Sequence, residues 1–521
     1  MAAPNEKLAT SLAALATLAP ARAVAARSLT RTHRERLVRA GFLSEVVKGW
    51  YIQARPDDRA GDSTAWFASM REFIAGDCDE RFGDQWHIGP EQSLMLRAGE
   101  RSLPRQVLVW APQANNQVLN LPHGTSLLLY RTPRLLPAAP VADAGGLRLV
   151  SLAEALVRAG PAFFTQQPLA ATVALASVPD ASELLHVLLA GSHTSLAGRL
   201  AGALRHAGRG EFADRIVSTM RAAGHKVDET NPFQQPVPLL PGNRAASPYA
   251  CRLQLMWRQM RTTVEAVFPA PAPVPSDAAA LLRDVEARYV TDAYHSLSIE
   301  GYSVTPELIE KVRTGTWDPD GDDRQLRDAM AAKGYFEAHK EVKASVERLL
   351  AGANPGAELR AAHATWYQAL FSPSVQAGLL KPQDLAGYRN DQVFIRGAQH
   401  VPLSKEAVRD TMPVLFDLLE DEVHAGARAV LGHFVFVYIH PYMDGNGRLA
   451  RFLMNAMLAP SGYPWTVIPV QRRAEYMAAL AQASSHQDIA PFAQFVAQRG
   501  AAQRAAPLPW PPSRQASAAG A

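Results

Sequence analysis

Apolar residues recur at helical spacing along most of this chain, and short alternating runs interrupt the pattern near the N-terminus. Four leucines spaced for one helix face are Leu8, Leu12, Leu15 and Leu18. Residues 22–27 predict a second short helix, and Thr30 begins a third that Gly41 ends, since glycine often follows a helix. Residues 43–52 predict a β-hairpin. Residues 1–58 therefore predict a small domain of helices followed by a hairpin.

Residues 60–235 combine helical stretches with strand-like runs, which predicts a mixed α/β domain. The helical stretches are 64–75, 152–160 and 182–207. The strand-like runs are 105–112, 125–132 and 147–152. The sequence of this region contains no glycine-rich phosphate loop, no metal-ligand spacing and no nucleophile elbow. It therefore indicates no activity of its own.

Two proline-rich stretches follow, at 231–243 and 268–276, and one helical pattern lies between them at 248–267. Proline-rich chain continues neither a helix nor a central strand, and it behaves as a semi-rigid spacer. Residues 236–276 therefore predict linkers around a single helix, which join the α/β domain to the C-terminal part of the chain.

Residues 277–499 predict an almost entirely helical domain. Its exception is a strand pair at 392–395 and 400–401, before another helix from Lys405. The last residues, 500–521, are rich in proline, alanine and serine and predict a disordered tail. The fold class is therefore multidomain, with a mainly α domain that follows two smaller ones.

The composition is that of a globular protein with several domains. Apolar residues make up 48% of the 521 residues and charged residues 20%, which suffices for sizeable buried cores. Cys78 and Cys251 match no metal or disulfide pattern, which favours a reducing cytoplasm. The alanine-rich stretch 8–26 lacks the leucine-type core of a signal peptide, and no run reaches the length of a membrane span. We therefore expect a cytoplasmic protein that binds no membrane.

The run from His440 to Arg451 concentrates more chemistry than any other stretch of the sequence. An apolar helical pattern at 429–439 precedes it, and Pro441 ends that pattern, so His440 stands at the mouth of a loop. Gly445 and Gly447 permit positive φ, which would turn successive backbone N–H groups inward as an anion-binding nest.

A new helix is predicted to start near Asn446, and the positive end of its dipole would face the same anion. Arg448 and Arg451 are three residues apart and share one face of this helix. Asp444 supplies one carboxylate of the kind that binds Mg²⁺ together with phosphate oxygens and water. A base, a metal ligand and an anion cradle together indicate a site for a nucleotide triphosphate and an attacking hydroxyl.

This run also resembles the Fic (Fido) family signature, H-P-[FY]-x-[DE]-G-N-G-R-x-x-R, at every defined position. The resemblance extends over most of 277–499 and implies a helical bundle with a β-hairpin flap. It implies transfer of AMP from ATP to a Ser, Thr or Tyr hydroxyl of a target protein. His440 would be the general base, Asp444 would hold Mg²⁺, and Arg451 would reach the γ-phosphate. The residues it implies for nucleotide binding are Asp444, Gly445, Asn446, Gly447, Arg448, Leu449, Ala450, Arg451 and Tyr476.

Two further segments match parts of the family. The family's flap, which aligns the target backbone by strand addition, corresponds to Val393, Phe394, Ile395 and Arg396. The string from Ser296 to Gly301, at the end of a helix predicted over 279–301, matches the inhibitory motif [ST]-x-x-x-E-[GN]. In that resemblance Glu300 pairs with Arg451 and takes the place of the γ-phosphate, while Ser296 faces the same side. Gly301 stops the helix.

The N-terminal region suggests an anionic partner. Residues 1–56 hold nine Lys/Arg against three Asp/Glu, whereas the net charge of the whole chain is only +4. The stretch RLVRAGFLSEVVKGWYI resembles the winged helix-turn-helix of type IV (abortive-infection) antitoxins, which implies DNA binding through residues 1–58. The alternative is a small structural cap.

Two alternatives to an adenylyltransferase stay open. One is a DNA-bound, antitoxin-like regulator whose Fic core senses nucleotide, and the other is removal of AMP from a modified protein (de-AMPylation). A homodimer is a further expectation, because relatives often regulate the inhibitory glutamate in that way.

Overall fold

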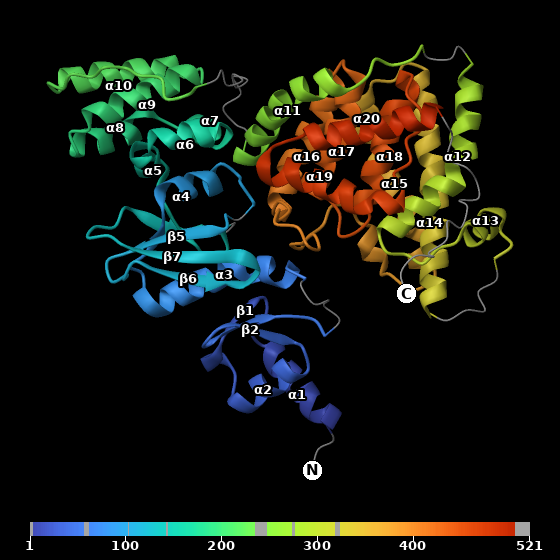
Figure 1. The fold of residues 1–521 in the computed structure, drawn as a ribbon, viewed down its shortest axis with the longest axis horizontal. Helices are drawn as coiled ribbons and strands as arrows, with labels where there is room; N and C mark the ends of the chain where they lie inside the picture. Colours follow the sequence, from blue (N-terminus) through green and yellow to red (C-terminus); the bar gives the residue numbers. More distant parts are fainter. Residues whose placement is uncertain are drawn as a thin grey trace, which may run out of the picture. The chain divides into compact units, whose positions relative to one another are not determined.

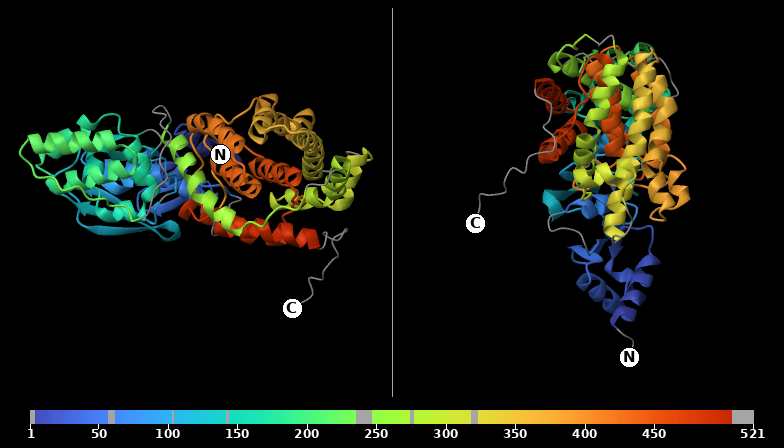
Figure 2. Two further views of the ribbon diagram at one scale, coloured as in Figure 1. Left: turned by 90° about the horizontal axis from the view of Figure 1, so that it is seen from above. Right: turned by 90° about the vertical axis from the view of Figure 1, so that its right-hand side faces the viewer.

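The computed structural model describes residues 4–56, 62–102, 104–141, 144–234, 247–273, 277–317 and 323–505 (Figures 1 and 2). The chain divides into two compact units. The first comprises Met1–Leu255 together with Val393–Pro402, and the second comprises Met256–Gln392 together with Leu403–Ala521. Neither unit is one continuous stretch of sequence. Of the two proline-rich stretches, 231–234 and 268–273 are described, whereas 235–246 and 274–276 fall outside the described residues.

The N-terminal part of the first unit consists of three helices and a three-stranded antiparallel sheet in the order β1-β3-β2. Its elements are α1 (Pro4–Ala16), β1 (Ala23–Ala25), the 3₁₀ helix η1 (Ala26–Ser28), α2 (Arg31–Arg39), β2 (Leu43–Val47) and β3 (Trp50–Gln53). Thr30 caps α2 as predicted, since its hydroxyl accepts a hydrogen bond from the backbone N–H of His33. The predicted hairpin is confirmed as β2 and β3.

The helix predicted at 22–27 is wrong. Ala23–Ala25 forms strand β1, which pairs with Ile52, Tyr51 and Trp50 of β3. Alanine has a high intrinsic helix propensity, but an isolated helix of six residues is unstable because nucleation is costly. The backbone hydrogen bonds to the edge of β3 stabilise the strand more than such a helix would be stabilised.

The predicted boundary near residue 58 does not separate two hydrophobic cores. Ala25, Trp50 and Ile52 belong to the same buried cluster as the apolar residues of α3 (Thr64–Phe82). The Trp50 ring lies so close to Gly76 that a Cβ there would come within 2.4 Å of it. A second small cluster, around Leu15, joins α1 to α2.

A six-stranded mixed sheet follows, with the strand order β6-β7-β5-β4-β9-β8. Its strands are β4 (His87–Ile88), β5 (Gln106–Ala111), β6 (Gln117–Leu121), β7 (Thr125–Arg131), β8 (Ala138–Pro140) and β9 (Arg148–Val150). The three predicted strand runs are confirmed as β5, β7 and β9. Helix α3 and the side chains of these strands share one core, and α4 (Pro90–Arg97) lies beyond the sheet from α3 in Figure 1.

After β9, residues 152–222 form a series of helices joined by short turns, so these helices follow the strands and do not alternate with them. They are α5 (Leu152–Arg158), α6 (Pro161–Gln166), α7 (Pro168–Ala176), α8 (Ala181–Ala190), α9 (Thr194–His206) and α10 (Gly210–Ala222). The single stretch predicted at 182–207 is two helices, because Gly191 and Ser192, the latter at φ 51°, turn the chain between them.

Within the described residues, no single helix has both the length and the apolar composition of a membrane span. The pair α7 and α8 meets those criteria jointly, with a bend of 106° between the two helices.

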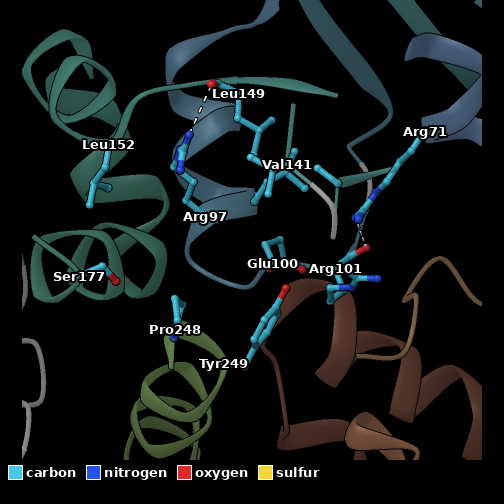
Figure 3. A pocket seen from close by; sticks show the side chains of 12 residues that line it. Arg71, Arg97, Glu100, Arg101, Val141, Leu149, Leu152, Ser177, Pro248 and Tyr249 are labelled. Atoms are coloured by element: carbon cyan, nitrogen blue, oxygen red, sulfur yellow. Dashed lines mark hydrogen bonds between the residues drawn. The ribbon is translucent and has the colours of Figure 1, made fainter. Parts of the chain in front are cut away.

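A cavity of about 320 Å³ lies in the first unit (Figure 3). Arg97 of α4 donates from Nε to the carbonyl of Val150, and Arg71 of α3 donates to the carbonyl of Arg101. Glu100 is bound by Arg252, and its other oxygen accepts from the backbone N–H of Ser102. These charged groups therefore hold loops and helices together around an otherwise apolar wall.

The second unit is a helical bundle, as predicted for 277–499 (Figures 1 and 2). Helix α11 (Pro248–Val267) continues into it from the first unit. The other helices are α12 (Ala278–Ile299), α13 (Pro306–Thr314), α14 (Asp323–Leu350), α15 (Pro355–Gln376), α16 (Lys405–Asp421), α17 (Ala425–Ile439), α18 (Asn446–Leu458), α19 (Arg473–His486) and α20 (Ala490–Ala505). Short 3₁₀ helices are η4 (Pro382–Leu385), η5 (Ala459–Ser461) and η6 (Val470–Arg472).

Two predictions for the C-terminal half are corrected. Residues 500–505 belong to α20 and not to a tail, and 506–521 lie outside the described residues. The strand pair at 392–395 and 400–401 is absent, although these residues are described. The chain does turn there, since the Ala398 N–H donates to the Ile395 carbonyl. Side chains of the first unit bind this turn, and its two arms do not pair with each other as a β-ladder.

Helices α14 and α15 approach each other closely at Gly334. A Cβ at this position would come within 1.9 Å of the Leu370 carbonyl oxygen. Because this oxygen belongs to the backbone of a packed helix, relieving the clash would require a shift of the helix itself. This contact sets the separation of two long helices that lie side by side in the bundle, and α15 in turn carries residues beside the candidate site.

Replacing Gly334 by alanine is expected to destabilise the second unit by about 1–3 kcal/mol, because overpacking outweighs the helix propensity that alanine adds. Thermal unfolding of the full chain, followed by circular dichroism, measures the effect. Lys333→Ala is the matched control, since Lys333 is exposed on the same helix and should change the transition little. An unchanged transition for Gly334→Ala would contradict the close approach.

Candidate functional site

The residue His440 forms the C-terminal cap of α17, a helix that is buried along nearly its whole length. It adopts the left-handed conformation, with φ 56° and ψ 62°. Its backbone N–H donates to the Phe436 carbonyl, and its ring Nδ1 lies 3.3 Å from the Val437 carbonyl oxygen. A carbonyl only accepts, so this contact puts the ring proton on Nδ1 and leaves the lone pair of Nε2 for another proton.

A second helix, α18, begins six residues after His440, and the loop between the two is closed by Asn446. The Asn446 side chain accepts from the Tyr442 N–H at 2.9 Å and donates to the Tyr442 carbonyl at 2.8 Å. Gly445 precedes the helix at φ 82°, where a side chain would collide with Phe371. The Asn446 side chain therefore shapes the loop by closing it onto Tyr442.

Sequence reasoning missed Arg389, which braces the same loop. Arg389 is buried, donates from Nε to the His440 carbonyl at 2.8 Å, and donates its backbone N–H to the Pro441 carbonyl at 2.9 Å. Its other guanidinium nitrogens bind the carbonyls of Asp391 and Leu403. These bonds fix the unusual backbone of His440. Nothing in the local pattern around Arg389 distinguishes it from a surface arginine.

Helix α18 points its two arginines to one side. Arg448 is buried and donates from Nη2 to Asp444 Oδ2 at 3.0 Å, while its guanidinium lies over the rings of Tyr302 and Phe371. Burial by surrounding protein atoms raises the pKa of Asp444. The charge of Arg448 and the hydrogen bond from the Gly445 N–H have the larger effect, and they hold the pKa of Asp444 below the ordinary value. The Asp444 side chain is 65% exposed, so it remains open to a ligand.

One expectation for this helix is corrected, and two stay predictions. Leu449 and Ala450 are buried and pack in the core, because the helical period turns their side chains away from the arginine face. Their part in nucleotide binding stays a prediction. Gly447 is helical and does not have positive φ. Its small size matters for another reason, since a Cβ there would lie 2.4 Å from Glu300 Oε1.

The carboxylate of Glu300 therefore lies directly above the first turn of α18. Arg451 Nη2 donates to Glu300 Oε1 at 2.7 Å, and Arg451 Nε donates to Ser296 Oγ at 2.9 Å. Ser296 and Arg451 are buried, whereas the Glu300 side chain is 29% exposed. Glu300 caps α12, and Gly301 follows at φ 90° as the predicted stop. A negative group thus occupies the anion position that the dipole and the N–H groups of α18 create.

Tyr476, on α19, is 2% exposed. Its hydroxyl hydrogen-bonds to Nε2 of the buried His433 of α17 at 3.0 Å, and burial raises its pKa. The ring therefore forms part of the wall behind Arg451, and the hydroxyl is already engaged within the protein.

The flap residues predicted at 393–396 belong to the first unit. Arg396 pairs with Asp62 at 2.6 Å, and the N–H of its neighbour Gly397 donates to the Thr64 hydroxyl at 3.0 Å. The Arg22 guanidinium lies 4.6 Å from the centre of the Phe394 ring. Val393 and Ile395 are half-buried. The ion pair and the Thr64 hydroxyl hold the pKa of Asp62 at about 2, although burial opposes this.

In the part of the chain that the structure describes, no group of three or more His, Cys, Asp or Glu side chains could hold a metal ion by itself. Asp444 offers one exposed carboxylate beside an arginine-rich anion site. That donor set fits Mg²⁺ bound mainly through phosphate oxygens and water, as is usual for this ion.

The enclosure of the His440 ring lowers its pKa to about 4, and the Val437 carbonyl opposes this only in part. We therefore expect the imidazole to stay neutral from pH 7 down to about pH 5. Nuclear magnetic resonance of histidine-labelled protein, with the His440→Asn spectrum to assign the signal, measures this. A midpoint near 6.5, the ordinary value of histidine, would contradict the enclosed environment.

Comparison with known proteins finds relatives that are similar to part of this chain. The chain is 31% identical over 228 residues to protein adenylyltransferase Fic of Nematostella vectensis, a match that covers 43% of this chain and 50% of that protein. It is 36% identical over 129 residues to protein adenylyltransferase fic-1 of Caenorhabditis elegans, covering 24% and 25%. The chain thus spans half or less of the length of these curated relatives.

Among solved structures, a Fic-1 fragment from C. elegans matches with a TM-score of 0.37 and 21% identity, over 65% of this chain and 96% of that one. A Fic domain-containing signalling protein from Bacteroides thetaiotaomicron matches with a TM-score of 0.34 and 18% identity, over 47% and 92%. The Fic/DOC family model matches residues 355–458, the stretch that runs from the start of α15 to the end of α18 and contains His440, Asp444, Arg448 and Arg451.

Proposed function

We propose that this chain is a protein adenylyltransferase that transfers AMP from ATP to a Ser, Thr or Tyr hydroxyl of a target protein and that Glu300 restrains at rest. The observation that carries the proposal is the Glu300 carboxylate, held by Arg451 over the N-terminus of α18. An anion position next to a neutral histidine is the arrangement that transfer of a phosphorus group to a hydroxyl needs. The relatives named protein adenylyltransferase Fic support the choice of AMP.

In the proposed reaction, Nε2 of His440 accepts the proton of the target hydroxyl, whose oxygen attacks the α-phosphorus of ATP. The bond to pyrophosphate breaks, and pyrophosphate leaves. His440 suits this role because its ring is neutral at pH 7 and its proton is held on Nδ1 by the Val437 carbonyl. Arg389 and Asn446 keep the loop in shape, so the base is positioned before the substrate arrives.

The nucleotide phosphates would lie at the start of α18. Backbone N–H groups of Gly447 and Arg448 and the side chains of Arg448 and Arg451 supply positive charge there. Asp444 would hold Mg²⁺, which neutralises phosphate charge when it is bound. Tyr476 lines the site behind Arg451, and the segment 393–396 would align the target backbone, by the family resemblance.

Restraint by Glu300 follows from charge. An arginine bound to a carboxylate is not available to a phosphate, and the carboxylate repels the nucleotide. Both oxygens of Ser296 also bind Arg451, which holds the arginine in its blocked orientation. De-AMPylation is the related alternative, because a glutamate over this site could also orient a water molecule toward a modified hydroxyl.

A second candidate function, DNA binding by the N-terminal region, is favoured by one observation. The order α1, β1, η1, α2, β2, β3 is compatible with a winged helix-turn-helix, and Arg31 and Arg39 of α2 are exposed, with Arg31 paired to Glu35 of the same helix. The other two arginines of α2 serve the fold, since Arg34 binds the Ala26 carbonyl and Arg36 binds the Lys7 carbonyl.

Glu300→Gly is expected to raise transfer of label from α-labelled ATP by about tenfold or more, because a charge-assisted hydrogen bond that holds Arg451 is lost. Adding His440→Ala to Glu300→Gly should lower the rate by about 100-fold or more, the contribution of a general base. Glu347→Gly, at an exposed position of α14, is the matched control and should behave like the unmodified chain. Absence of label in every variant would rule out adenylyl transfer, and loss of label from a premodified target would favour de-AMPylation.

For DNA binding, we expect a gel shift by the full chain that weakens steeply with salt, because phosphate contacts release counterions. The double change Arg31→Glu and Arg39→Glu should abolish the shift. Lys226→Glu, at an exposed lysine of the same unit, is the control and should leave it intact. No shift on any duplex at low salt would leave residues 1–58 with a structural role.

A further inference from the structure

The carboxyl end of α12 positions Glu300, and the last four carbonyl groups of the helix lack hydrogen-bond partners within it. All four accept hydrogen bonds from groups close to the helix end. Leu297 accepts from the N–H groups of Glu300 and Tyr302, and Ser298 accepts from that of Gly301. The other two bind arginines, since Ser296 accepts from Arg451 at 3.1 Å and Ile299 accepts from Nε of Arg473 at 2.8 Å. Two separate side chains therefore hold the helix end from outside.

Arg473 is the first residue of α19 and follows η6 directly. The same segment makes a second contact with α12, because the Val470 N–H donates to Nδ1 of His295 at 3.3 Å. His295 and Ile299 are four residues apart and share one face of α12. Burial lowers the pKa of His295 to about 4, so the ring is neutral at pH 7 and can accept this bond. Residues 470–473 thus bind two successive turns of the helix.

We propose that Arg473 is a positioning residue for the restraint, a second latch that holds Glu300 over α18 independently of Arg451. The inference rests on the proposed function. Arg451 must exchange its carboxylate partner for phosphate when a nucleotide binds in the productive way. The Arg473 bond goes to a backbone carbonyl that phosphate does not replace, so it survives that exchange and keeps α12 close to the site.

Electrostatics and geometry both favour this role. A cation at a helix C-terminus is stabilised by the helix dipole, and here it binds the residue immediately before Glu300. Fixing the Ile299 carbonyl fixes the peptide plane that joins Ile299 to Glu300. Glu300 Oε1 lies only 2.4 Å from the position that a Cβ of Gly447 would take, so a shift of this peptide would alter the contact between the carboxylate and the start of α18.

Arg473→Met, which keeps the aliphatic stem and removes the donor, tests the latch in the full chain. The basal rate of label transfer from α-labelled ATP is expected to rise about tenfold, the usual effect of losing one charge-assisted hydrogen bond. Arg473→Lys retains the charge, so its basal rate should lie between the rates of the unmodified chain and of Arg473→Met. The matched control is Arg472→Met, because the adjacent, half-buried Arg472 pairs with Glu475 and lies over the Phe495 ring, away from the Ile299 carbonyl, and should not change the rate.

The decisive measurement repeats Arg473→Met in the Glu300→Gly background. With no carboxylate left to position, the additional change should be less than about twofold, since the two changes act on one element. Hydrogen exchange should also become faster at the N–H groups of Gly301 and Tyr302 in the single variant. Arg473→Lys keeps the test decisive if the methionine variant does not fold.

Two outcomes would overturn the latch. One is an unchanged basal rate in both Arg473 variants while Glu300→Gly is activated. The other is an equal fall in rate in both backgrounds, which would make Arg473 a substrate contact or a purely structural residue. If Glu300→Gly itself brings no gain, the failure belongs to the proposed restraint and not to Arg473 alone, so the two ideas are separable.

Discussion

The site depends on one constraint: the positive end of α18 can hold a single anion. Helix dipole, backbone N–H groups and two buried arginines converge on a small volume beside Gly447. Leaving this volume without a negative charge would be costly, because Arg451 is buried. A carboxylate from α12 satisfies it at rest. Under the proposed function, one interaction would therefore both stabilise the resting fold and inhibit the reaction, and a nucleotide would have to replace this internal partner in order to bind productively.

His440, the proposed base, has a different requirement: its ring must be held in place and remain uncharged. His440 has a left-handed backbone that histidine rarely adopts, and this conformation persists because Arg389 and Asn446 bind the flanking carbonyl and N–H groups. The same enclosure keeps the ring neutral. The arginines of α18 therefore supply positive charge to the start of that helix, whereas the His440 ring a few residues earlier stays neutral. In the proposed reaction, these would be the anion-binding and proton-accepting parts of the site.

Local sequence signals predicted much of this arrangement. An apolar run ended by Pro441 and followed by Gly445 defined α17, the loop and α18, and the cap at Thr30 and the stop at Gly301 were equally readable. Interactions that span the chain were not. Arg389 and Arg473 act on carbonyls of distant segments, and no spacing marks an arginine for that task. The strand at 23–25 exists only because β3 lies beside it, and Gly447 is required by the approach of Glu300 and not by its own φ.

The segment Val393–Pro402 gives the chain an unusual topology. Ten residues inserted in the helical bundle are counted with the N-terminal unit, where Asp62, Thr64 and Arg22 bind them. The two units are consequently joined by three covalent crossings and not by one linker. A single cut of the chain therefore cannot separate the two units. If evolution had gained, lost or exchanged the N-terminal unit as a simple terminal fusion, the inserted segment would have been left without its contacts to that unit.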